Sequence, residues 1–250
     1  MTVIGVVGED ENHFWVVTTL VDDALIAAID WLPGVIESCR AWRGLLNGER
    51  WYKYASDDTY DLRPVTIDGV TIKPQGRIAG EPLRSEAGMW RKVLLLFCHA
   101  NPRPDIVVLA RDLDGYPDRR SGIEQVCNGL PWPFKIVAAL PDPEIEGWLV
   151  SGFMPKDADE QARLEQVRRE LSFDPTTQSH RLTSHPNAAP TDAKRVLSQL
   201  CDDDHEREQA CLERDVLHQR GERNGARAFL DEVDQRVVPL FRRAISRQDG

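Results

Sequence analysis

The stretch that decides the fold is Pro104-Asp105-Ile106-Val107-Val108-Leu109-Ala110-Arg111-Asp112-Leu113-Asp114-Gly115. Its five consecutive apolar residues are too few for a helix and rich in β-branched side chains, so we predict a fully buried central strand. Asp112 and Asp114 follow where this strand ends. In open α/β sheets, ligands bind at the carboxyl ends of the strands, and a hard cation such as Mg²⁺ takes oxygen ligands. A metal site and an acidic, solvated turn are both compatible with this stretch alone.

The composition is that of an ordinary globular protein, with 41% hydrophobic and 29% charged residues. No apolar run approaches the length of a bilayer, and we expect the chain to enter its first strand directly, without a signal peptide. The five cysteines are odd in number and scattered, which favours reduced thiols in the cytoplasm over a disulfide scaffold. A net charge of −10 argues against a non-specific nucleic-acid binder, although metal ions, a local basic patch or a partner could still attach nucleic acid.

The start of the chain repeats the order of strand, acids and helix. Thr2–Gly8 is predicted to be a strand, and the acids from Glu9 to Glu11 crowd its end. Apolar residues at helical spacing from Phe14 to Leu32 predict a helix, with Asn12 as its cap. Because this unit has the same shape as the stretch around Asp112, we expect both acidic ends at one edge of a mainly parallel sheet.

A third strand, Phe134–Leu140, is followed by another acidic segment. Asp142 suits a helix cap, Pro143 suits the first helical position, and Glu144 and Glu146 fall in the first turn. Helix capping alone would explain these acids, but the segment lies at the same sheet edge as the others. Four or five converging carboxylates repel one another unless cations neutralise them, and two-metal phosphoryl-transfer sites use such clusters.

The remaining sequence indicates an insertion and a helical C-terminal part. Within residues 35–85, the segments Pro64–Ile67 and Val70–Lys73 flank Asp68-Gly69, which predicts a tight hairpin. A polar loop is expected at 116–120, and further helices are expected at 86–99, 121–128, 157–171, 191–200, 203–218 and 225–245.

Several short motifs resemble a known family. The early strand ending in a glutamate and the later strand ending in Asp-x-Asp resemble the TOPRIM domain of topoisomerases, primases and certain nucleases. The segment Glu144–Leu149 resembles the Glu-x-Trp-Leu segment of small bacterial TOPRIM-like proteins. These are similar to the nuclease part of the OLD (overcoming-lysogenisation-defect) family, often found with ATPase partners in phage defence. Asp192–Leu197 and Asn224–Leu230 also resemble that group.

The resemblance implies a TOPRIM-like α/β domain over residues 1–155, with the insertion at about 35–85 and a helical extension over 156–250 packed on it. It also implies a hydrolase, namely a Mg²⁺- or Mn²⁺-dependent nuclease that cleaves phosphodiester bonds. The expected substrate is DNA, and the expected setting is bacterial anti-phage defence in the cytoplasm, with an ATPase partner.

The resemblance also implies roles for particular residues. Glu9, Asp112 and Asp114 would act in catalysis, together with Lys194 as the late lysine near the scissile phosphate. A lysine exposed on a helix surface is the more common situation, however. The implied metal ligands are Glu9, Asp112, Asp114, Glu144 and Glu146.

The sequence departs from the family pattern at two places. Asp10 stands where the family has a glycine, and Ser151-Gly152 where relatives often show an aspartate. These differences leave open a site with altered metal affinity, or an inactive interaction subunit that only docks onto an ATPase. A zinc site can also be imagined, but the spacing of its candidate ligands lacks the close pairs of structural zinc sites. These candidates are Cys201, His205, Cys211 and His218.

A second enzymatic hypothesis concerns the same central stretch. Asp112–Gly115 also fits the start of a haloacid-dehalogenase-type motif, in which Asp112 attacks phosphate as a nucleophile. That motif normally continues with threonine or valine and lies near the N-terminus. Here Tyr116 follows in mid-chain, so this phosphatase hypothesis ranks below the nuclease.

Overall fold

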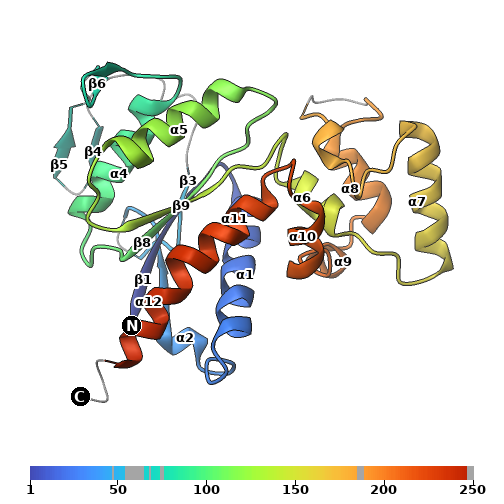
Figure 1. Ribbon diagram of the computed structural model, residues 1–250, viewed down its shortest axis with the longest axis horizontal. Helices are drawn as coiled ribbons and strands as arrows, with labels where there is room; N and C mark the ends of the chain where they lie inside the picture. Colours follow the sequence, from blue (N-terminus) through green and yellow to red (C-terminus); the bar gives the residue numbers. More distant parts are fainter. Residues whose placement is uncertain (47, 54–64, 68, 74–75, 185–188, 247–250) are drawn as a thin grey trace. The chain divides into compact units, whose positions relative to one another are not determined.

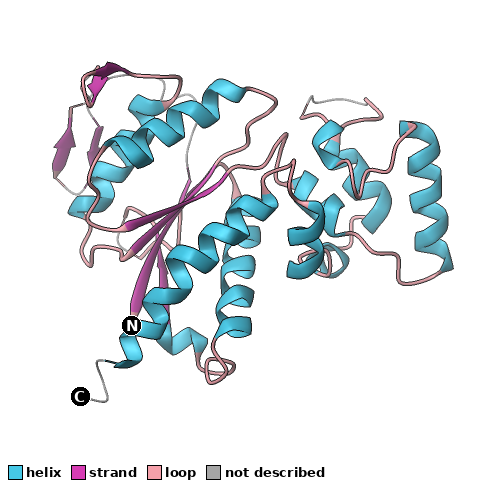
Figure 2. Ribbon diagram, in the orientation of Figure 1, coloured by secondary structure: helices cyan, strands magenta, loops and turns pink. Residues whose placement is uncertain are grey.

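The computed structural model describes residues 1–46, 48–53, 65–67, 69–73, 76–184 and 189–246. Asp68 of the expected hairpin turn, and Pro64 before it, lie outside the described residues. Figure 2 distinguishes the helices from the strands. Within the described ranges, no helix is both long and apolar enough to cross a membrane.

The described residues form a five-stranded sheet around β1 (Thr2–Gly8). On one side, β1 pairs in parallel with β8 (Ile106–Ala110), which in turn neighbours β9 (Lys135–Ala139). On the other side, β1 pairs in parallel with β2 (Arg40–Arg43) and then with β3 (Tyr52–Lys53). The expected α/β class with a mainly parallel sheet flanked by helices is therefore confirmed, and it is consistent with a TOPRIM-like arrangement.

Helices pack closely on both faces of β1, where glycines admit them. Side chains alternate between the faces of a strand, so Gly5 and Gly8 face opposite ways. A Cβ added at Gly5 would lie 2.8 Å from Phe97 of α4 (Ala87–His99), and one at Gly8 would lie 2.8 Å from His13 of α1 (Glu11–Ala28). All residues of β1 and β8 are buried, as expected for a parallel sheet covered on both faces (Figure 1).

The first helix begins earlier than its apolar pattern indicates. Its cap is Asp10, whose Oδ1 accepts a hydrogen bond from the backbone N–H of His13 at 3.1 Å. The same oxygen lies 2.8 Å from Nδ1 of the His13 ring. Asn12, the expected cap, is therefore inside the helix. Glu9 occupies the short connection between β1 and this cap.

The region from 35 to 85 is only partly an insertion, because β2 and β3 belong to the main sheet. The expected hairpin is present as β4 (Val65–Ile67) and β5 (Val70–Ile72), which pair antiparallel. Gly69, in the turn between them, has a left-handed φ of +79°. The other elements of the region are α2 (Ile36–Cys39), β6 (Arg77–Ile78) and β7 (Glu81–Pro82).

The rest of the chain is mostly helical, as expected. Two expected helices are interrupted: the 203–218 segment forms two helices, each with its own acidic cap, and the 225–245 segment contains a π-helical turn. The remaining elements are α5 (Pro117–Gly129), α6 (Glu146–Gly152), α7 (Ala158–Leu171), η1 (Ser179–Arg181), α8 (Ala193–Cys201), α9 (His205–Gln209), α10 (Arg214–Arg220), α11 (Ala226–Glu232), η2 (Val233–Val237) and α12 (Val238–Ser246).

The chain forms two compact units that are interleaved in sequence. The first unit comprises residues 1–110, 116–138 and 232–250, and the second comprises 111–115 and 139–231. This division differs from the expected boundary at residue 155, because α6 packs against α8 and α10 and so belongs with the later helices. The last helix, α12, belongs with the sheet, where it contacts α1.

Candidate metal centre

Four of the predicted acids and the predicted lysine belong to the second unit. Asp112 and Asp114 follow β8, Glu144 and Glu146 follow β9, and Lys194 lies in the first turn of α8. Glu9 belongs to the first unit, where it is half-buried after β1. Its participation in the same site stays a prediction.

The two acidic segments are held side by side by backbone hydrogen bonds that continue beyond the ends of β8 and β9. Each bond runs from an N–H of the first segment to a carbonyl oxygen of the second. The three pairs are Arg111 with Ala139 at 2.9 Å, Leu113 with Pro141 at 2.9 Å, and Asp114 with Pro143 at 2.8 Å.

Asp112 and Asp114 are fixed in different ways. Asp112 is buried, and its Oδ1 accepts the backbone N–H of Ile145 at 2.9 Å. Asp114 is half-buried and has a left-handed φ of +51°, a conformation that aspartate tolerates better than most residues. Together with Gly115 at +71°, this conformation turns the chain immediately after the two acids.

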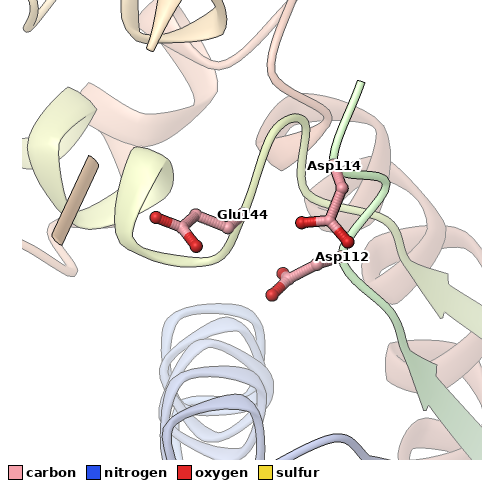
Figure 3. A group of neighbouring side chains, drawn as sticks. All are labelled: Asp112, Asp114 and Glu144. Atoms are coloured by element: carbon pink, nitrogen blue, oxygen red, sulfur yellow. The ribbon is translucent and has the colours of Figure 1, made fainter. Parts of the chain in front are cut away.

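The side chains of Asp112, Asp114 and Glu144 lie near one another (Figure 3). One oxygen from each of the three lies within 4.8 Å of the others. Like charges at this separation repel one another, particularly where burial lowers the effective dielectric. A divalent cation, which prefers oxygen ligands, would remove that repulsion. The acidic cluster of Asp112, Asp114 and Glu144 can therefore bind a metal ion.

Glu144 has the most unusual environment of the three. It is 4% exposed, and its Oε1 is buried without a hydrogen-bond partner among the described residues. Burial, followed by the nearby charge of Glu146, raises the pKa of Glu144 to about 8, although Lys194 acts in the opposite direction. A buried polar atom without a partner is unfavourable for folding. A ligand at this oxygen would supply the missing interaction.

Lys194 lies beside the two glutamates. Its Nζ is 3.8 Å from Oε2 of Glu144 and 4.0 Å from Oε1 of Glu146, and its side chain is 60% exposed. The helix that carries it is capped by Asp192, whose side chain accepts the backbone N–H of Arg195 at 2.8 Å. The structure thus brings the predicted lysine to the acidic segment, and its catalytic role stays a prediction.

The helix after β9 starts later than expected. Asp142 does not cap it, and Pro143, joined to Asp142 by a cis peptide bond, lies before it. The helix begins at Glu146, and Glu144 therefore precedes it. The backbone N–H of Ile145 binds the carboxylate of Asp112 instead of a helix cap. Helix capping consequently does not account for Glu144.

Asn224 supports the segment that carries the glutamates, and sequence reasoning did not identify this role. Its backbone oxygen accepts the N–H of Asp142 at 3.0 Å and the indole N–H of Trp148 at 2.8 Å. Gly225, at a φ of +91°, allows the close approach, since a Cβ there would lie 2.3 Å from the carbonyl oxygen of Leu140. An Asn-Gly pair immediately before an apolar stripe was the available signal.

The buried side chain of Asn224 makes further hydrogen bonds to the same segment. The residue is 1% exposed, and its Nδ2 donates to the carbonyl oxygen of Gly147 at 3.3 Å. It also donates to the hydroxyls of Ser151, at 2.8 Å, and Ser179, at 2.9 Å. Oδ1 accepts the N–H of Ala226 at 3.1 Å. One buried side chain therefore connects α6, η1 and the start of α11.

The structure does not bring the four candidate zinc ligands together into one site. His205 Nδ1 lies 3.5 Å from the carboxylate of Glu208, and His218 Nε2 lies 2.9 Å from that of Asp231. Within the described part of the chain, the acidic cluster of Asp112, Asp114 and Glu144 is the group of three or more His, Cys, Asp or Glu side chains close enough to hold a metal ion.

No family model, no curated protein and no solved structure matches this chain. The resemblance to TOPRIM-like nucleases therefore rests on the short motifs of the sequence. The candidate site rests on its own geometry.

Proposed function

We propose that this chain is a hydrolase that uses Mg²⁺ or Mn²⁺, bound by Asp112, Asp114 and Glu144, to cleave phosphodiester bonds. The observation that carries the proposal is the buried Oε1 of Glu144, which has no hydrogen-bond partner among the described residues. Glu144 belongs to a group of three carboxylates, and one oxygen from each lies within 4.8 Å of the other two. Such an all-oxygen set suits Mg²⁺ and Mn²⁺ better than softer metals.

When bound, the ion would activate a water molecule and offset negative charge on the phosphate. The protein positions the metal ligands and the reactants. The N–H of Ile145 fixes the orientation of the Asp112 carboxylate, as the hydrogen-bonded partners of metal ligands commonly do. Lys194 is exposed enough to contact a phosphate while its Nζ stays near Glu144 and Glu146.

The identity of the substrate and the biological setting come from the sequence resemblance. We propose DNA as the substrate, an ATPase as a partner protein and anti-phage defence as the role. We also propose Glu9 and Glu146 as additional ligands. Because the net charge is −10, binding of nucleic acid should be weak without metal.

Calorimetric titration with Mn²⁺ tests the metal site. The wild type should bind the ion, and Asp112→Asn and Glu144→Gln should weaken binding by more than about tenfold, since even outer partners of metal ligands change affinity by that factor. Asp159→Asn, a change of the same kind at an exposed position in the first turn of α7, should leave binding unchanged. Equal binding by wild type and Glu144→Gln would contradict this site.

Cleavage of plasmid DNA tests the activity. Wild type with Mn²⁺, with or without a partner ATPase, should nick or cut the plasmid, and a chelator should stop it. Asp112→Asn should be inactive. Equal cleavage by this variant would show that a contaminant acts. A phosphoenzyme trapped on Asp112 with an aryl phosphate substrate would instead support the haloacid-dehalogenase-like phosphatase.

A further inference from the structure

Two cysteines of the second unit lie against each other in its interior. Cys201 is the last residue of α8, and Cys211 follows α9. They are 1% and 0% exposed, and their Sγ atoms are 3.9 Å apart. This separation exceeds a disulfide bond length by only about 2 Å. No disulfide joins the pair, and no part of the candidate metal centre uses it.

Arg207 makes the environments of the two sulfur atoms differ. Its Nη1 lies 3.7 Å from Sγ of Cys211, and that sulfur also donates a hydrogen bond to the backbone oxygen of Arg207 at 3.4 Å. The hydrogen bond from Cys201, together with the charge of Arg207, lowers the pKa of Cys211. The pKa of Cys201 is raised by its hydrogen bond with Cys211 and by burial. A thiolate-forming cysteine beside a neutral thiol is the arrangement of an attacking and a resolving cysteine.

Arg207 is itself held firmly in this position. Its Nε and Nη2 donate to the two carboxylate oxygens of Glu160 at 2.8 and 3.0 Å. Nη2 also donates to the backbone oxygen of Met154 at 2.6 Å. A fixed guanidinium next to Cys211 would repel a metal cation. The geometry therefore favours thiol chemistry over zinc binding at this pair.

The segment between the two cysteines can give a small oxidant access to them. It is short, and its only helix, α9, has five residues. Apart from Arg207 and the half-buried Glu208, the residues from 202 to 210 are exposed. Short, exposed segments are the ones that open locally without unfolding the rest of a protein. Partial opening at the exposed residues 202–206 would let a small oxidant reach the pair while Arg207 keeps its contacts with Glu160 and Cys211.

We propose that Cys201 and Cys211 form a redox-active pair that a hydroperoxide converts into an intramolecular disulfide and a thiol reductant restores. The Cys211 thiolate attacks the terminal oxygen of the peroxide and the O–O bond breaks, so that Cys211 becomes a sulfenic acid and hydroxide leaves from hydrogen peroxide, or an alkoxide from an organic hydroperoxide. The sulfur of Cys201 then attacks Cys211, the S–S bond forms, the S–O bond breaks, and water leaves with the Cys201 proton. The two sulfurs give up two electrons, which the peroxide accepts.

Mass spectrometry on the full chain tests this pair. Native protein is treated with hydrogen peroxide, quenched in acid, denatured and alkylated. A variant with Cys39→Ser, Cys98→Ser and Cys127→Ser keeps the pair alone and provides the clearest sample. It should lose about 2 Da and both alkylation sites, because two hydrogens leave when the disulfide forms, and a thiol reductant should restore them.

Wild type supplies the second arm of the experiment. Its peptide map after native oxidation should show the Cys201–Cys211 cross-link. The same oxidation in urea, where the structure no longer holds the pair together, should give mixed pairings among the cysteines. Cys211→Ser should form no cross-link from Cys201.

Two results would overturn the proposal. One is native oxidation after which Cys201 and Cys211 are still both alkylated. The other is conversion of either residue to a sulfinic acid, or its cross-linking to another cysteine, in place of their mutual disulfide. The variant that keeps only the pair gives a decisive result even if Cys211→Ser does not fold.

Discussion

Asp114 combines a left-handed backbone conformation with a carboxylate that lies close to two others. Its φ is +51°, and one of its carboxylate oxygens lies within 4.8 Å of those of Asp112 and Glu144. Two unit charges about 4 Å apart repel by roughly 4 kcal/mol at an effective dielectric of about 20, before relaxation and protonation. The metal-free protein therefore keeps an unfavourable interaction that a bound cation would relieve.

Replacement of Asp114 by asparagine should separate a metal site from a structural turn. The change keeps the shape and removes one charge, so the variant should melt at or above the wild-type temperature in chelator. Mn²⁺ should stabilise the wild type by about 1.4 kcal/mol at ten times its Kd, and the variant should lose most of this gain. Thermal melts with and without Mn²⁺ measure both effects, with Asp159→Asn as the control. A wild type that no divalent ion stabilises would contradict the metal site.

Glu160 gives a residue-scale prediction that does not depend on metal. Burial alone would raise its pKa, but the hydrogen bond from Arg207 and those from Lys156 lower it to about 2. Because this pKa is below its ordinary value of 4.5, the pair stabilises the fold fully above about pH 4.5. The stabilisation is lost as the pH falls from there toward 2.

Glu160→Gln should therefore reduce the free energy of unfolding by about 3 kcal/mol at neutral pH, and by progressively less below about pH 4.5. Urea denaturation over a series of pH values measures the difference. Glu165→Gln, at a half-exposed position in the same helix, serves as the control and should change little. A difference for Glu160→Gln that stays constant down to about pH 3 would contradict the assignment.

At the scale of elements, the long elements are predictable because their signals are local. β8 follows from its run of apolar residues, and α7 from its Asp157 cap, which accepts the N–H of Glu160 at 2.8 Å. The strand β2 is not predictable in this way. It begins and ends with arginines, and Arg40 becomes buried only because Asp22 and Glu37, from other elements, pair with it.

The turn at Asn224 is an element-scale support of the candidate site. Asn224→Ala removes the donor shared by Gly147, Ser151 and Ser179, so it should destabilise the protein by about 1–3 kcal/mol. It should also weaken Mn²⁺ binding by about tenfold, as loss of outer support commonly does. Urea denaturation and calorimetry measure the two effects. Gln219→Ala, at an exposed position, is the control. Unchanged Mn²⁺ affinity in a destabilised variant would reject the positioning role.

At the scale of the whole molecule, the order of the strands predicts the site better than individual motifs do. Acids that follow neighbouring parallel strands must leave the sheet at one edge, and this places Asp112 and Asp114 opposite the segment that carries Glu144. The sequence does not reveal which of these acids is buried. Glu144 looks like a first-turn residue in the sequence, but the helix begins only at Glu146, and the backbone N–H of Ile145 binds Asp112 instead.

The division into two units limits what the sequence predicts about Glu9. The resemblance assigns Glu9 to the same site, but Glu9 and the acidic cluster belong to different units. Glu9→Gln tests the assignment directly. If Glu9 is a ligand, this variant should weaken Mn²⁺ binding by more than about tenfold, comparably to Glu144→Gln. Calorimetry that shows wild-type affinity for Glu9→Gln would remove Glu9 from the site.

Whether Asp112, Asp114 and Glu144 hold a divalent cation is tested most directly by a crystal structure of the full chain grown with Mn²⁺, with anomalous diffraction data. We predict an anomalous peak about 2.1–2.3 Å from an oxygen of each of the three carboxylates, between the distances typical of Mg²⁺ and Ca²⁺. Oε1 of Glu144 should be among the ligands or bonded to a water of the ion. Crystals that contain Mn²⁺ elsewhere but show no peak at these three carboxylates would contradict the metal site.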